Sequence, residues 1–186
     1  MGIYINPGNE VFRVKRNSKY IDKSGLIGVV NHSIGRPNKL SCVSRPRRFG
    51  KSYAAQMLCA YYCVECDSAP LFDDLEIAKD ASYKVHLNQY NVIYMDISGF
   101  IGKTSLDTIL KYITDTFSKE IYDLYPNVKK ADSLPDLLLN VVENTGRQFI
   151  AIIDEWDAPI RDKDCTPAMQ KAYLQFLRSL FKDSSI

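Results

Sequence analysis

Gly50, Lys51 and Ser52 are the residues of this chain best suited to binding phosphate. They follow an apolar run, Leu40–Val43, and precede a helical pattern, which is the context that a phosphate-binding loop requires. Glycine lets the backbone approach a phosphate, the lysine ammonium would contact the β- and γ-phosphates, and the serine hydroxyl would bind Mg²⁺. The N–H groups at the start of the following helix would complete an anion-binding cradle.

Arg47, Arg48 and Phe49 directly precede Gly50 and belong to the same predicted nucleotide-binding loop. The two arginines add positive potential. The full phosphate-loop signature has a glycine five residues before Gly50, where this chain has Arg45, so the pattern is a partial match. A chance Gly-Lys-Ser sequence in a loop is the alternative.

A second sequence of this kind, Gly102–Thr104, competes for the same role. It also follows an apolar run, but its upstream glycine, Gly99, is too close for the standard spacing. Gly50–Ser52 lies in a strongly basic segment and leaves room for one more strand before the acidic pair described next. We therefore favour Gly50–Ser52 and interpret Gly102–Thr104 as a polar loop and helix start.

Two neighbouring acids, Asp154 and Glu155, follow the apolar run Phe149–Ile153. An aspartate at a strand end can hold Mg²⁺, and a neighbouring glutamate can act as the catalytic base that polarises the attacking water. The alternative is that one carboxylate caps the next turn. Asp96 is a weaker candidate because no second acid follows it. For Asp157 two roles are open: supporting the metal site or capping a turn.

Strand patterns alternate with helical patterns along the chain. Three short apolar runs are predicted to be buried strands: Leu40–Val43, Val92–Ile97 and Phe149–Ile153. Apolar stripes predict helices after Ser52, over 106–124, over 134–142 and over 169–180. A capping box at Ser133 and Asp136, a stop at Gly146 and a start at Thr166–Pro167 set their bounds. This alternation predicts an α/β fold whose parallel sheet carries helices on both faces and binds ligands at the carboxyl ends of its strands.

The composition fits one domain, with 186 residues of which 46% are hydrophobic. No apolar run approaches the roughly 20 residues of a membrane span, and no secretory signal is visible, so we expect a cytoplasmic protein with reduced cysteines. Residues 1–51 hold 11 Lys/Arg against two acids, a net +9, whereas the remainder carries −7. The basic segment suits a nucleoside triphosphate or nucleic acid, and equally a solvated basic face.

Four separated segments together resemble the bacterial AAA-ATPase-like family of predicted P-loop ATPases. The stretch Ser44–Ser52 looks like its phosphate loop, which typically has an arginine at the position of Arg45. Tyr20–Ile27 is similar to its upstream signature, and Asp154–Asp157 resembles its acidic strand end. The fourth segment, Leu71–Ile77, is similar to the part after the first helix. The resemblance implies an ATP hydrolase that uses ATP and Mg²⁺.

The resemblance further implies that residues 1–186 are the N-terminal part of the ATPase domain, with a sheet that is incomplete at the C-terminus. In the family another strand with a Thr-Gly turn follows, and many members continue into a restriction-type nuclease-like domain. A fused or associated nuclease would make nucleic acid a possible partner. A missing strand bears on turnover more than on fold class.

Mg²⁺-dependent ATP binding and hydrolysis is the leading functional prediction. The alternatives are a nucleotide-gated interaction module with little turnover and a DNA-associated protein whose basic segment contacts phosphates. Two roles are open for Asp22 and Lys23: a local structural role, which we favour, and a nucleotide contact. Cys59, Cys63 and Cys66 are interpreted as core thiols because a structural zinc site needs four suitably spaced ligands.

Overall fold

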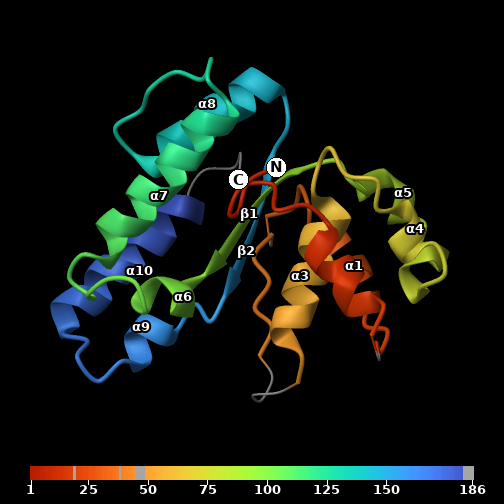
Figure 1. The fold of residues 1–186 in the computed structure, drawn as a ribbon, viewed down its shortest axis with the longest axis horizontal. Coiled ribbons are helices and arrows are strands. Elements are labelled where there is room, and N and C mark those ends of the chain that lie inside the picture. The colour runs from red at the N-terminus through yellow and green to blue at the C-terminus, as the bar shows by residue number, and fades with distance from the viewer. Residues whose placement is uncertain (19, 38, 45–48, 182–186) are drawn as a thin grey trace.

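The computed structural model describes residues 1–18, 20–37, 39–44 and 49–181 (Figure 1). The N-terminal elements are α1 (Glu10–Arg16), α2 (Gly25–Asn31), α3 (Lys51–Tyr62), α4 (Ala69–Phe72), the 3₁₀ helix η1 (Glu76–Lys79) and α5 (Tyr83–His86). They are followed by β1 (Asn91–Asp96), α6 (Ile97–Ile101), α7 (Ile109–Leu124), α8 (Leu134–Thr145), β2 (Phe149–Asp154), α9 (Ala158–Arg161) and α10 (Pro167–Phe181). The fold is mixed α/β and mostly helical.

The two strands form a small parallel sheet. β1 pairs with β2 from Asn91 opposite Phe149 to Asp96 opposite Asp154. Residues 4–6 lie along the other edge of β1, where the Asn6 N–H donates to the Val92 carbonyl and the Tyr94 N–H donates to the Tyr4 carbonyl, both at 2.8 Å. The predictions for these two strands are confirmed, with bounds that shift by one residue, whereas the pairing of the N-terminal segment had no signal in the sequence.

The third predicted strand is wrong. Residues 39–44 have no regular secondary structure, and the side chains of Leu40 and Val43 are 66% and 46% exposed. An apolar run becomes a strand only where an edge satisfies its N–H and C=O groups. Within the described ranges no strand pairs with the outer edge of β2, so Leu40–Val43 does not add a third strand there. The observed sheet is therefore smaller than the sheet that the sequence predicted.

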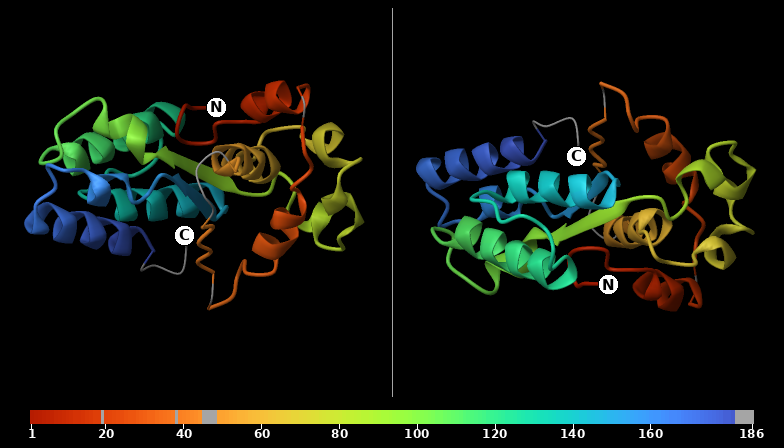
Figure 2. Two further views of the ribbon diagram at one scale, coloured as in Figure 1. Left: turned by 90° about the horizontal axis from the view of Figure 1, so that it is seen from below. Right: turned by 90° about the horizontal axis from the view of Figure 1, so that it is seen from above.

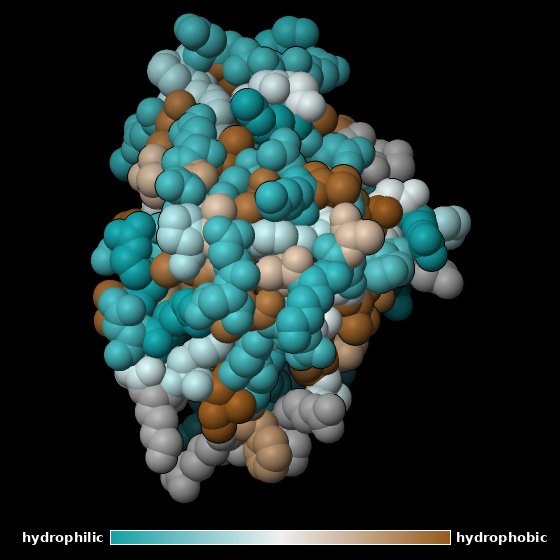
Figure 3. Space-filling view, turned by 90° about the vertical axis from the view of Figure 1, so that its right-hand side faces the viewer, coloured by the Kyte–Doolittle hydropathy of each residue, from teal (hydrophilic) through white to brown (hydrophobic). Residues whose placement is uncertain are grey.

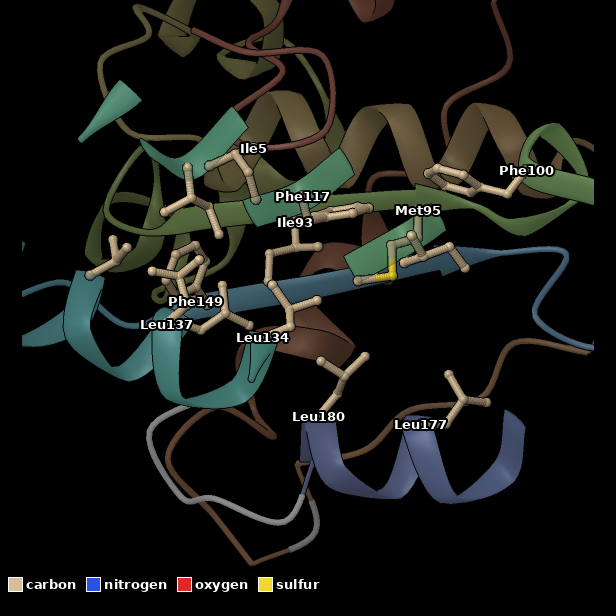
Figure 4. Packing of buried hydrophobic residues seen from close by; sticks show 14 of the residues in the cluster. Ile5, Ile93, Met95, Phe100, Phe117, Leu134, Leu137, Phe149, Leu177 and Leu180 are labelled. Carbon is tan, nitrogen blue, oxygen red and sulfur yellow. The ribbon is translucent and has the colours of Figure 1, made fainter. Parts of the chain in front are cut away.

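Helices cover both faces of the sheet, as the sequence predicted (Figure 2). Because side chains alternate along a strand, Ile93 and Met95 of β1 enter a core built with α6, α7, α8 and α10. Val92 and Tyr94 point to the opposite face, into a second core built mainly with α1–α5. Figure 4 shows the first core, where Leu177 and Leu180 of α10 point toward β2 and the side chains of α8.

Local signals set the ends of two helices where the sequence predicted them. The Ser133 hydroxyl accepts the Asp136 N–H at 3.2 Å at the start of α8, and Gly146 follows its end with a φ of 69°. That left-handed conformation costs glycine little. The Thr166 hydroxyl accepts the Met169 N–H at 3.3 Å at the start of α10. The helix predicted over 106–124 is shorter, because α7 begins at Ile109.

The outer surface is mainly hydrophilic where Figure 3 shows it. Over the side of the molecule that carries α4 and α5, brown hydrophobic side chains are scattered among teal hydrophilic ones. Among the described residues, no helix has both the length and the apolar character needed to cross a membrane.

Candidate functional site

The Gly50–Ser52 segment opens α3. Gly50 has a φ of 77°, a left-handed conformation that favours glycine, and it stands at the N-cap of the helix. The first hydrogen bond of α3 joins the Ala54 N–H to the Gly50 carbonyl at 3.0 Å, so the earlier N–H groups of the first turn point out of the helix end. The first turn carries no acidic residue. Such a helix end attracts anions.

Asp154 ends β2 on the face of the sheet that α3 covers. Side-chain alternation places it on the same side as Ile150 and Ile152, which pack in the α3 core. In Figure 1, β1 and β2 run downward toward the end of the molecule at which α3 begins. The carboxylate of Asp154 and the first turn of α3 therefore lie at one end of the sheet.

Asp154 is an ionisable residue with only 8% of its surface exposed. Burial and the charge of Asp154 raise the pKa of Tyr94 to about 12. Burial lowers the pKa of Lys15 from α1, and the nearby Asp154 carboxylate opposes this shift. The Lys15 ammonium lies 4.4 Å from the ring centroid of Tyr53, two residues after Lys51. Lys15 thus contributes a positive charge near the buried Asp154 carboxylate.

Glu155 lies in a turn held from two sides. Its φ of 50° is left-handed, which is uncommon outside glycine. Arg161 holds the carboxylate, with 2.6 Å between Nη2 and Oε2, and also pairs with Asp157 at 2.9 Å. The Tyr173 hydroxyl of α10 donates to the Trp156 carbonyl at 2.6 Å. The Glu155 side chain keeps 33% of its surface exposed, so it can reach a ligand.

Asp96 and Asp157 have local roles. Asp96 stands beside Asp154 in the strand register but caps α6, where it accepts the Ser98 hydroxyl at 2.6 Å and the Gly99 N–H at 3.3 Å. Asp157 precedes α9, and its carboxylate pairs with Arg161. Hydrogen bonds to Asp157 and then to Glu155 raise the pKa of Arg161.

The structure separates the two Gly-Lys-Ser/Thr sequences. Gly102 follows the end of α6 and the loop continues to α7, so the expected helix start is wrong for this segment. The Lys103 ammonium donates to the Tyr4 hydroxyl at 3.1 Å. Of the predicted nucleotide-binding residues, Phe49, Gly50, Lys51 and Ser52 lie together at the start of α3, whereas Arg47 and Arg48 lie outside the described residues.

Two cations near these residues, Lys15 and Arg161, were not predicted from the sequence. The i, i+4 spacing of Asp157 and Arg161 could have indicated their pairing on a short helix. Lys15 had no comparable signal, because it reaches the site through the packing of α1 against α3.

The helix start, the buried strand-end aspartate and the parallel sheet define a class of α/β proteins that bind ligands at the carboxyl ends of their strands. The chain belongs to the family described as Predicted AAA-ATPase, whose model matches residues 10–184. This membership confirms the resemblance and indicates nucleotide binding or ATPase function. A search of curated proteins and a search of solved structures each found no match.

The cysteines are expected to bind no structural metal. Cys59 and Cys63 are fully buried, and burial raises the pKa of the Cys59 thiol, which disfavours the thiolate that metals bind. Elemental analysis of the purified protein should find no zinc after dialysis. Stoichiometric zinc that resists dialysis would contradict the interpretation of these residues as core thiols.

Proposed function

We propose that this protein binds ATP with Mg²⁺ and hydrolyses it, in a P-loop nucleotide-binding fold. The N–H groups at the start of α3 and the Lys51 ammonium bind the phosphates. Ser52 and Asp154 hold Mg²⁺, and Glu155 polarises the attacking water. Phe49 and Gly50 belong to the same proposed nucleotide-binding loop. Arg47 and Arg48 are proposed for that loop too, although they lie outside the described residues.

One observation carries this proposal. Alternation along β2 places Asp154 on the same face as Ile150 and Ile152, which α3 covers, and β2 ends at the end of the sheet where α3 begins (Figure 1). A phosphate-binding helix start and a buried aspartate would thus share one ligand. Family membership independently indicates a nucleotide.

The donor set suits Mg²⁺, which prefers hard oxygen ligands and keeps several waters. Ser52 contributes an exposed hydroxyl and Asp154 a buried carboxylate. When bound, the ion would neutralise charge on the phosphates. The protein's part is to hold the phosphates at the start of α3, place Lys15 near Asp154, and present Glu155 from an anchored turn.

Arg161 bears on how Glu155 would act. As described above, the arginine holds the glutamate in an ion pair, so the carboxylate that accepts a proton from water must first leave or share this partner. Such a pair fixes the side chain while the ligand is absent, because a charge-assisted hydrogen bond is stronger than a neutral one.

A titration of the purified protein with fluorescently labelled ATP and GTP, with and without Mg²⁺, tests the proposal. We expect saturable ATP binding that Mg²⁺ strengthens. Binding without detectable hydrolysis would favour the nucleotide-gated module, and absence of binding to either nucleotide would contradict the proposal.

A further inference from the structure

Lys23 reaches from the N-terminal side of α2 to the loop that precedes α3. Its ammonium donates a hydrogen bond to the Phe49 carbonyl at 2.7 Å. A Cβ placed on Gly50 would lie 3.0 Å from the same nitrogen. The cation therefore lies against the two residues that directly precede Lys51, although it is 26 residues away in the sequence.

The backbone that carries Lys23 is firmly anchored. Asp22 accepts the N–H groups of Ser24 and Glu76, each at 2.8 Å, and the Ser24 hydroxyl accepts the Ile77 N–H at 3.1 Å. Ser24 is completely buried. Although burial raises the pKa of Asp22, the hydrogen bonds from Glu76 and Ser24 lower it overall. The backbone on either side of Lys23 is thus held against the start of η1, and the Lys23 side chain extends to the loop before α3.

Lys23 has more hydrogen-bond donors, and more charge, than the Phe49 carbonyl can satisfy. An ammonium has three N–H donors and a full positive charge, and a neutral carbonyl takes one donor without compensating the charge. The Lys23 side chain is exposed, so its remaining donors can meet a ligand. An anion bound at the start of α3 would lie beside them.

We infer that Lys23 binds the phosphates of the nucleotide at Gly50–Ser52, as a second cation beside Lys51. The inference rests on the proposed function and extends it to a residue whose role the sequence left open. Phosphate binding by Lys23 depends on its positive charge. If Lys23 only shaped the loop, its role would depend on the hydrogen bond to the Phe49 carbonyl instead.

Three substitutions separate these two roles. Lys23→Gln keeps a donor for the Phe49 carbonyl but removes the charge, Lys23→Met removes both, and Lys23→Arg keeps both. We expect ATP affinity in the presence of Mg²⁺ to fall by about tenfold or more for Gln and Met, because a charge-assisted phosphate contact is lost. The Arg variant should stay within about threefold of the parent, because arginine keeps the positive charge and can still make a charge-assisted contact with phosphate.

The controls make each outcome decisive. Lys84→Gln, which changes an exposed lysine of α5, should bind ATP like the parent, and thermal unfolding without nucleotide should show that all variants fold. Parent-like affinity of Lys23→Gln, with weakening only in Lys23→Met, would overturn the inference in favour of loop shaping. If Lys51→Ala weakens binding and no Lys23 variant does, the proposed function stands and the inference fails. If the parent itself binds no nucleotide, both fail.

Discussion

Glu155→Gln is expected to slow single-turnover ATP hydrolysis by about 10²–10⁴-fold, the usual contribution of a general base. Glutamine keeps the shape of the side chain and can still accept a hydrogen bond from Arg161, which contacts Glu155 at 2.6 Å. The turn should therefore remain folded. Because the substitution removes a negative charge near the triphosphate, ATP affinity should hold or rise.

The comparison needs two further variants. Glu143→Gln changes an exposed glutamate of α8, whose side chain keeps 71% of its surface exposed, and should hydrolyse ATP like the parent. Asp154→Ala should instead weaken Mg²⁺-ATP binding itself, because it removes a proposed metal ligand. Hydrolysis by Glu155→Gln at the rate of the parent would contradict the assignment of Glu155 as the general base.

Lys51→Ala should weaken ATP binding by about 1.5–3 kcal/mol, the range for a lost charge-assisted hydrogen bond. Equilibrium binding of labelled ATP measures this change. The reason is the position of Lys51 in the first turn of α3, where the helix end already favours an anion.

Lys103→Ala is the matched control, since it removes a lysine from the rival Gly-Lys-Thr sequence. In the structure Lys103 contacts the Tyr4 hydroxyl and lies 5.8 Å from the ring centroid of Phe100. We expect its loss to leave ATP affinity unchanged. Weakened binding in Lys103→Ala, with parent-like binding in Lys51→Ala, would mean that the phosphate loop was assigned to the wrong segment.

The sequence predicted best what local chemistry decides. Ser133 and Gly146 bound α8 because a cap and a left-handed turn act within a few residues. β1 and β2 were predicted from apolar runs that the structure buries on both faces. Leu40–Val43 has a similar composition but stays exposed and pairs with no strand, because strand pairing depends on the packing of distant segments.

The candidate site also has a part that could be predicted from the sequence and a part that could not. Gly50–Ser52 and Asp154–Glu155 were visible as short motifs, and alternation along β2 explains why Asp154 points to α3. The contacts of Lys23 and Lys15 were not visible, because each residue comes from a segment that is distant from α3 in the sequence. Long-range contacts of this kind leave no periodic signal in a single sequence.

The most direct test of a single Mg²⁺-nucleotide site is a double-mutant cycle on Ser52 and Asp154. ATP affinity would be measured with and without Mg²⁺ for the parent, Ser52→Ala, Asp154→Asn and the double variant. If both residues hold one ion, each single substitution should remove most of the gain in affinity that Mg²⁺ gives, and the second substitution should add little. Two independent, additive losses, or a full Mg²⁺ effect in Asp154→Asn, would contradict the proposal that the strand end and the helix start hold the same ion.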